Sequence, residues 1–284
     1  MKYVKKRKKL NIVFLIVSIF FGLYALSLLV PLIWGLVMSL QSRIEFITDK
    51  VSFPKVLHFE NYVKAFVELQ SGGNNMFSMI FNSVWWSLGT SFISVMTTLA
   101  SAYVCAKYKF VGRQAMYWIS IVTVMLPISG ALPSRYKVFS LLGLINGPQI
   151  LLSAFSIFGM HYIIAYAFFK DLSWEYAESA FLDGAGHLRV YVQIMLPMAI
   201  SPAIALLLTE FIGNWNDSAT PLIFLPDFPT LASGFYIYQE QSGRMLDYPV
   251  LFAGLFVAAA PIIALYLIFQ DTLMDLQIGS GMKG

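Results

Sequence analysis

Long stretches without any Asp, Glu, Lys or Arg divide this sequence of 284 residues. They lie at 10–42, 69–106, 114–134, 138–169, 190–209 and 248–270. Each can hold the roughly 20 apolar residues that an α-helix needs to cross a bilayer. Charged residues make up only 12% of the chain, about half of the roughly 25% that is usual in a soluble domain. The pattern predicts a membrane protein and leaves no room for a separate soluble catalytic domain.

The apolar stretches predict an all-α, polytopic fold, because backbone groups in hydrocarbon must be paired within a helix and the runs are too long for barrel strands. We place six transmembrane helices at roughly 10–38, 79–105, 115–134, 149–169, 197–219 and 249–270. The basic run from Lys2 to Lys9 is expected to stay in the cytoplasm. Its following apolar run is too long for a signal peptide, so we interpret it as a retained anchor.

Six crossings return the carboxyl terminus to the cytoplasm. The predicted organisation is a cytoplasmic amino terminus (1–9), a transmembrane domain (10–270) and a cytoplasmic carboxyl-terminal tail (271–284). The single cysteine, Cys105, excludes an intrachain disulfide and argues against a metal cluster.

Small polar residues recur every three or four positions along the second predicted helix. They are Ser83, Ser87, Thr90, Ser91, Ser94, Thr97, Thr98 and Ser101. Such a stripe lets helices approach closely and form hydrogen bonds across the contact. We favour helix packing over a substrate path for this face.

A polar segment at 170–197 separates the fourth and fifth predicted helices. Ser173 is suited to cap a helix through Glu175 to Ser179, since hydroxyls accept hydrogen bonds from the first turn and acidic residues suit the positive end of the helix dipole. Asp183-Gly184 then predicts a turn before a second helix from about His187 to Met195. Two short helices and a turn are typical of a rigid surface that a soluble partner can grip.

The same segment resembles the EAA loop of bacterial ABC importer permeases. Glu178-Ser179-Ala180 is followed at the family's spacing by Gly184, Ile194 and Leu196-Pro197, with serine at 179 in place of the usual alanine. The resemblance implies a type I importer permease whose cytoplasmic coupling helix docks into a cytoplasmic ATP-binding subunit. It assigns this docking to Glu178, Ser179, Ala180, Asp183, Gly184, Ile194, Leu196 and Pro197.

The rest of the chain is similar to carbohydrate-type permeases of maltose and oligosaccharide importers. The similar segments are Pro31-Leu32-Ile33-Trp34, Asn82-Ser83, Tyr108-Lys109-Phe110, Leu142-Gly143-Leu144-Ile145-Asn146 and Phe211 to Asp217. The ending Gly279-Ser280-Gly281-Met282-Lys283-Gly284 resembles the tail that the second maltose-type permease places between the ATPase chains. In this tail we expect Gly279, Gly281, Met282, Lys283 and Gly284 to contact the ATPases.

This resemblance implies a bacterial cell-membrane subunit that is not an enzyme and carries no cofactor of its own. Its expected partners are a second homologous permease, two cytoplasmic subunits that bind ATP and Mg²⁺, an extracytoplasmic solute-binding protein and a sugar. No nucleic acid is expected. An ABC permease for another solute, an ion-coupled secondary transporter and a membrane enzyme are the alternatives. The sequence shows no inverted repeats, which a secondary transporter is expected to have. It shows no paired catalytic groups, which a membrane enzyme is expected to have.

Glu210 is the one acidic residue well inside a predicted membrane helix, and such a charge suggests a function. Asn214 and Asp217 follow at helical spacing, so the three share one face. This face can line the pathway, contact the partner permease or form hydrogen bonds within the bundle. For His161 we favour a hydrogen-bonded packing role over proton relay. We expect a pathway poor in charge, as suits a neutral sugar.

Overall fold

The computed structural model describes residues 12–126 and 130–279. Within these residues the backbone is helical or irregular, and the one β-type pairing is an isolated bridge. The all-α prediction is therefore confirmed for the described chain. The described residues divide into two compact units, one of residues 12–66 with 244–257 and one of residues 67–126 and 130–243 with 258–279.

The first unit contains α1 (Ile12–Ser39), α2 (Arg43–Thr48), most of α3 (Glu60–Glu68) and the beginning of α14 (Tyr248–Gly279). The Trp34 ring of α1 meets Phe252 of α14 edge to face, with centroids 5.4 Å apart. From Ile12 to Trp34 every side chain of α1 is exposed. A helix with an apolar surface of this kind is suited to contact lipid.

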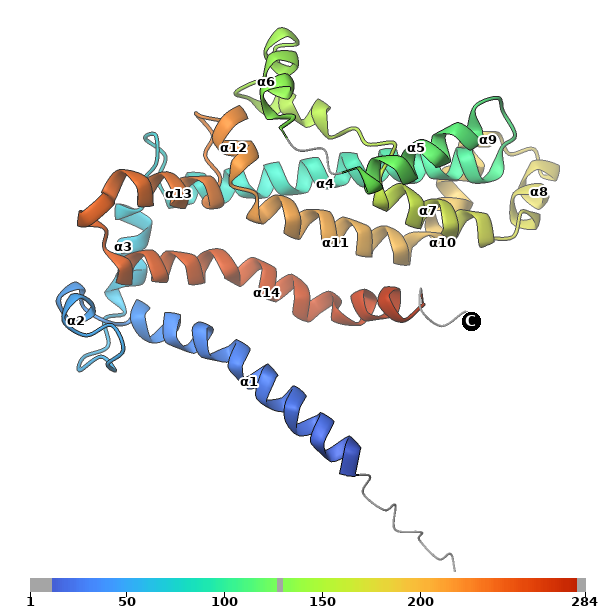
Figure 1. Cartoon of the computed structure of the whole chain (residues 1–284). Coiled ribbons are helices and arrows are strands. Elements are labelled where there is room, and N and C mark those ends of the chain that lie inside the picture. Colours follow the sequence, from blue (N-terminus) through green and yellow to red (C-terminus); the bar gives the residue numbers. More distant parts are fainter. Residues whose placement is uncertain (1–11, 127–129, 280–284) are drawn as a thin grey trace, which may run out of the picture. The chain divides into compact units, whose positions relative to one another are not determined.

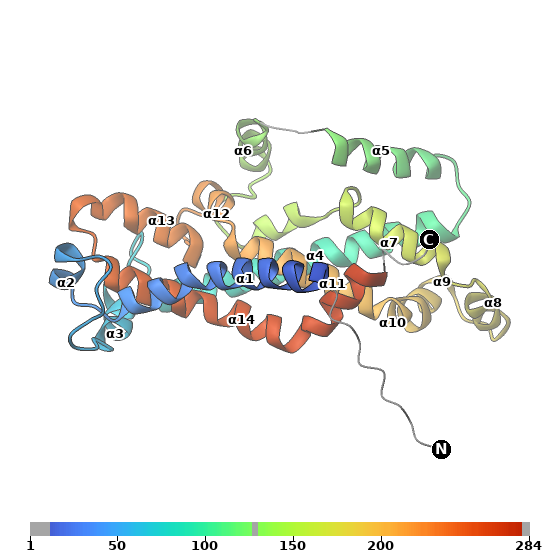
Figure 2. The ribbon, with the colours of Figure 1, turned by 60° about the horizontal axis from the view of Figure 1, so that its bottom comes forward.

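The second unit holds the remaining helices. They are α4 (Met76–Lys107), α5 (Arg113–Met125), α6 (Leu132–Leu141), the 3₁₀ helix η1 (Pro148–Ala154), α7 (Met160–Asp171), α8 (Glu175–Leu182), α9 (His187–Val190), the π-helical turn η2 (Tyr191–Met195), α10 (Leu196–Met198), α11 (Ile200–Asn216), α12 (Ala219–Phe224) and α13 (Leu231–Ser242). The long helix α4 packs along both α7 and α11 (Figures 1 and 2). Leu99, Tyr162 and Leu206 are buried in the core among these three helices.

The polar stripe of α4 lies in these contacts, and six of its residues are buried. Ser83 Oγ accepts the backbone N–H of Leu231 at 2.7 Å. Thr97 and Thr98 donate to the carbonyl of Ser156 at 3.1 and 3.0 Å. Small side chains that also form hydrogen bonds allow close helix packing, so the predicted packing role of the stripe is confirmed.

Among the described residues, three helices are long and apolar enough to cross a membrane: α1, α4 and residues Tyr248–Asp271 of α14. A fourth candidate is the pair His187–Met198 and Ile200–Asn216, whose two parts are bent by 77°. These four correspond to the first, second, sixth and fifth predicted spans.

The third predicted span, 115–134, is not one continuous helix. Helix α5 ends at Met125, and Leu126 is extended with φ −87° and ψ 116°. The physical reason is the next residue, Pro127, whose ring disfavours helical backbone at the position before it. Helix α6 begins only at Leu132.

The fourth predicted span, 149–169, is also broken. Its first part is the 3₁₀ helix η1, and α7 begins only at Met160. Gly159 stands between them with φ +102°, a backbone conformation that side-chain-bearing residues rarely adopt. Apolar composition indicated membrane depth here but gave no sign of the break.

Candidate functional site

Residues 170–197 form a compact projection at one end of α4 (Figure 2). The two predicted short helices are present as α8 and as the continuous run of α9 and η2. Ser173 Oγ accepts the N–H of Glu175 at 3.3 Å, but the N-cap position itself is Trp174. Glu175 and Glu178 lie in the first turn, where the helix dipole favours negative charge.

The turn between the helices depends on Gly184, whose φ is +84°. Its N–H donates to the carbonyl of Phe181 at 3.0 Å, and the N–H of Ala185 donates to the carbonyl of Ala180 at 2.9 Å. Glycine is favoured in this left-handed conformation because it has no Cβ. The predicted turn at Asp183-Gly184 is confirmed.

The residues of the EAA-like motif divide between surface and interior. Glu178, Ser179, Asp183, Gly184 and Pro197 are exposed, whereas Ala180, Ile194 and Leu196 are half-buried. Two apolar side chains also protrude from this loop, with Leu182 89% and Leu188 76% exposed. The exposed side of the loop thus carries both carboxylates and apolar side chains.

The inner side of loop 170–197 is fixed to the end of α4. Ala177, Val190 and Met195 are fully buried. The Lys107 ammonium donates a hydrogen bond to the carbonyl of Leu172. These buried side chains and this hydrogen bond attach the loop to the end of α4.

An aromatic cluster also joins the loop to the end of α4. Its members are Tyr103, Tyr108, Trp174, Phe181, His187 and Tyr191. The Tyr108 hydroxyl and His187 Nδ1 share a hydrogen bond of 2.9 Å, and the rings of Tyr103 and Tyr191 stack at 4.9 Å. Sequence reasoning did not identify this cluster. The signal was the aromatic enrichment on both sides of the loop.

A cavity of about 280 Å³ is the second candidate site. It lies among α4, α6, η1, α11 and α12 and includes Trp86, Arg135, Ser153, Glu210, Asn214 and Asp217 in its lining. The structure thus brings together Glu210, Asn214 and Asp217, the three residues that the helical spacing placed on one face. Thr90 and Ser94 of the polar stripe also line this cavity, so the stripe does more than pack.

Hydrogen bonds orient the polar lining. Glu210 Oε1 lies 3.0 Å from His161 Nδ1 and 3.2 Å from the Ser94 hydroxyl. Asn214 donates to the hydroxyl of Ser91 at 3.1 Å. Glu210 therefore both forms hydrogen bonds within the bundle and borders the cavity, and His161 has a hydrogen-bond partner.

Arg135 is a lining residue that sequence reasoning missed. Its guanidinium carbon lies 5.3 Å from the ring centre of Phe139 and 5.5 Å from that of Phe224, a geometry that stabilises a cation beside aromatic faces. Together with Glu210 and Asp217 it makes the cavity richer in charge than we expected. In the sequence Arg135 stands with Lys137 between two uncharged stretches, a pattern that does not indicate a position at a cavity.

Comparison with known proteins identifies the family. Residues 98–276 match the family described as "Binding-protein-dependent transport system inner membrane component". The chain is 28% identical over 252 residues to the diacetylchitobiose uptake system permease protein NgcG of Streptomyces coelicolor, covering 87% of this chain and 82% of that protein. It is 26% identical over 273 residues to the arabinooligosaccharides transport system permease protein AraQ of Bacillus subtilis, covering 94% and 95%.

A solved structure shares the fold. It is a chain of a bacterial ABC transporter involved in the import of the acidic polysaccharide alginate, with a TM-score of 0.77 and 20% identity, covering 94% of this chain and 99% of that one. At this level of identity the likeness concerns the fold alone. The protein therefore belongs to the family of binding-protein-dependent transport system inner membrane components and is the permease of an ABC importer, not an enzyme.

Proposed function

We propose that this chain is one of two non-identical permeases that form the pore of a bacterial importer for sugars or oligosaccharides. Two cytoplasmic subunits bind ATP and Mg²⁺ and dock on loop 170–197, and an extracytoplasmic solute-binding protein delivers the sugar. The observation that carries the proposal is the form of this loop. It exposes Glu178 and Leu182 while its opposite side is fixed to α4.

The mechanism follows from what the loop is joined to. Its aromatic cluster contacts the end of α4, and its chain continues through the 77° bend into α11. Both α4 and α11 contribute polar residues to the cavity of Glu210. When the ATP-binding subunits close, a push on loop 170–197 therefore shifts the two helices that border the cavity and opens it to the outside.

The proposed topology has six crossings with both termini in the cytoplasm. The third and fourth crossings are the broken segments around α5 with α6 and around η1 with α7. Interrupted helices are tolerated at membrane depth where they border a protein interior or a cavity, and α6 and η1 both supply lining residues.

The carboxyl-terminal tail is proposed to contact the ATP-binding subunits. Gly279 is the last residue of α14, so this helix extends beyond residue 270, the predicted end of the sixth span. Gly281, Met282, Lys283 and Gly284 lie outside the described residues. Their role rests on the resemblance of the ending to the maltose-type tail.

A sugar is the preferred substrate because the named relatives serve diacetylchitobiose and arabinooligosaccharide transport. The hydroxyl and amide groups of Ser153 and Asn214, beside the Trp86 ring, are also suited to a polyhydroxylated ligand. A second candidate is a charged, non-sugar solute, which the presence of Arg135 in the cavity favours. Uptake of a labelled neutral oligosaccharide against a labelled anionic solute separates the two.

The coupling proposal is tested in vesicles that contain the complete importer. Glu178→Lys places a cation where the ATPase contact is proposed, and we expect loss of ATP-driven uptake with normal insertion of this chain. Glu175→Lys, a charge reversal on an exposed residue of the same helix outside the motif, is the matched control and is expected to retain most activity. Undiminished uptake by Glu178→Lys would overturn the assignment.

A further inference from the structure

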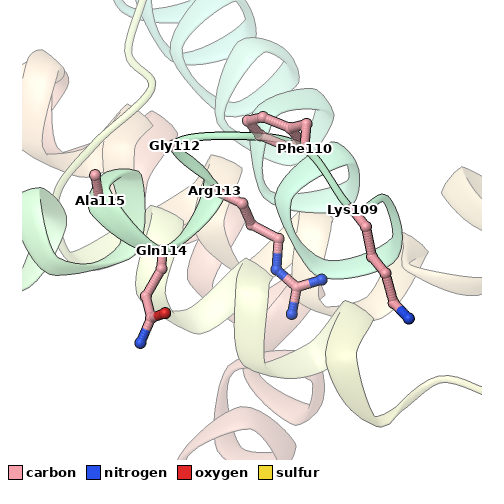
Figure 3. A pocket seen from close by; sticks show the side chains of 6 residues that line it. All are labelled: Lys109, Phe110, Gly112, Arg113, Gln114 and Ala115. Atoms are coloured by element: carbon pink, nitrogen blue, oxygen red, sulfur yellow. The ribbon is translucent and has the colours of Figure 1, made fainter.

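A basic pocket lies between α5 and α7, and it shares Lys170 with loop 170–197. It has a volume of about 320 Å³ and is lined by Arg113, Gln114, Tyr117, Trp118, Tyr166 and Lys170. Next to it lies an open depression at the α4–α5 loop. Arg113 and Gln114 line both the pocket and the depression, and Lys109 lines the depression. Figure 3 shows Lys109, Arg113 and Gln114 projecting to the same side of this loop.

Within the part of the chain that the structure describes, the cations of the pocket and of the adjoining depression form no ion pair. Among the described residues, no carboxylate oxygen lies within 4.0 Å of Lys109, Arg113 or Lys170. The Arg113 guanidinium donates one hydrogen bond to a described residue, to the carbonyl of Tyr108 at 3.3 Å. The neighbouring Asp171 interacts electrostatically with Lys107. The pocket therefore presents uncompensated positive charge and suits an anion.

The remaining walls are aromatic and lead onto an apolar face. The rings of Tyr117 and Tyr166 lie 4.9 Å apart, and Trp118 is 55% exposed. One turn further along α5, Val122 is 48% exposed on the same face as Trp118. Tyr and Trp side chains are typical of the headgroup level of a membrane, and an apolar strip below them is suited to acyl chains.

We propose that this pocket binds the phosphate-bearing headgroup of an anionic membrane lipid. Arg113 and Lys170 contact the phosphate, Gln114 donates to its oxygens, and the acyl chains lie along the Trp118 and Val122 face of α5. Basic pockets between membrane helices bind anionic headgroups by this chemistry. Free phosphate would use the same cations, but it would make no use of the apolar strip, which is why the structure favours a lipid.

The test uses the full chain in nanodiscs of phosphatidylcholine with a small fraction of phosphatidylglycerol. Native mass spectrometry counts the phosphatidylglycerol molecules that remain on the protein. We expect one to be retained by the wild type, and phosphatidylcholine to be lost. The double variant Arg113→Gln/Lys170→Gln should bind phosphatidylglycerol roughly 25-fold more weakly, since each cation at a membrane surface contributes about fivefold.

Matched controls distinguish the effect of removing charge at the pocket from the effect of lowering the net positive charge of the protein. Lys55→Gln/Lys64→Gln removes two exposed lysines elsewhere and should retain the lipid. Arg113→Lys/Lys170→Arg keeps both charges and should recover most of the binding, which also shows that the pocket still folds. Equal retention by the glutamine variant and the wild type would overturn the proposal, as would equal losses in the two pocket variants.

Two further arms identify the bound anion. Inorganic phosphate alone at millimolar concentration should not displace phosphatidylglycerol, and Trp118→Leu should weaken lipid retention. Displacement by phosphate with no effect of Trp118→Leu would assign the pocket to a free anion and reject the lipid. Adding the ATP-binding subunits should leave the lipid in place. Its complete release by these subunits would identify the pocket as a protein contact and contradict the proposal.

Discussion

Gly184 offers the sharpest single-residue test of how loop 170–197 is built. Its backbone has φ +84°, and a Cβ added there would meet no atom within 4 Å. Gly184→Ala therefore introduces no clash, and its cost comes from the backbone alone. Placing a side-chain-bearing residue in the left-handed region costs about 1–2 kcal/mol, which corresponds to a factor of roughly 5 to 30 in the population of the open turn.

Gly186→Ala is the matched control two residues away. Gly186 has φ −78° and ψ 161°, which any residue adopts, and a Cβ there also meets nothing within 4 Å. Alanine reduces the freedom of the unfolded loop but is a poorer N-cap than glycine. These effects oppose each other, so we expect a net change within about 0.5 kcal/mol.

Hydrogen exchange followed by mass spectrometry measures the difference. In peptides covering residues 173–190, Gly184→Ala should exchange roughly 5 to 30 times faster than the wild type, and Gly186→Ala should match the wild type. Asn tolerates the left-handed conformation better than Ala, so Gly184→Asn should lie between. Identical exchange for Gly184→Ala and Gly186→Ala would refute the argument that the turn depends on its backbone conformation.

Two further substitutions test the packing that supports the sites. Gly234→Ala would place a Cβ against Sδ of the buried Met79, closer than two such atoms can approach. The Tm in detergent should therefore fall by an amount that corresponds to about 1–3 kcal/mol, and adding Met79→Ala should recover part of the loss. An unchanged Tm contradicts this. Tyr108→Phe removes the hydrogen bond to His187 but keeps the aromatic ring. The rate of hydrogen exchange in α9 should rise by about fivefold, which corresponds to the loss of about 1 kcal/mol. An unchanged exchange rate would show that the hydroxyl does not hold the loop.

Features set by local sequence were predictable. The long apolar runs predicted α1, α4 and α14, because a helix is the structure that satisfies an uninterrupted apolar backbone in lipid. The turn at Gly184 was predictable because Asp-Gly is a local signal with its own conformational cause. Helical spacing also placed Glu210 and Asn214 on one face, and both line the cavity.

Features that depend on distant parts of the chain were not predictable. The break before Met160 arises from Gly159, and a single glycine within an apolar run does not reveal whether the helix continues. Arg135 reaches the cavity because α6 and η1 fold over α4 and α11, which no local pattern encodes. The aromatic cluster likewise joins Tyr108 to His187 across 79 positions of sequence.

The central claim, that loop 170–197 is the contact for the ATP-binding subunits, is tested most directly by crosslinking in vesicles that contain the complete importer. A photoreactive amino acid replaces Leu182, which is 89% exposed on this loop, and in a second variant replaces Leu141, which is 78% exposed at the end of α6. We predict that position 182 crosslinks to an ATP-binding subunit and that position 141 does not. Crosslinks to that subunit from position 141 and none from position 182 would contradict the account.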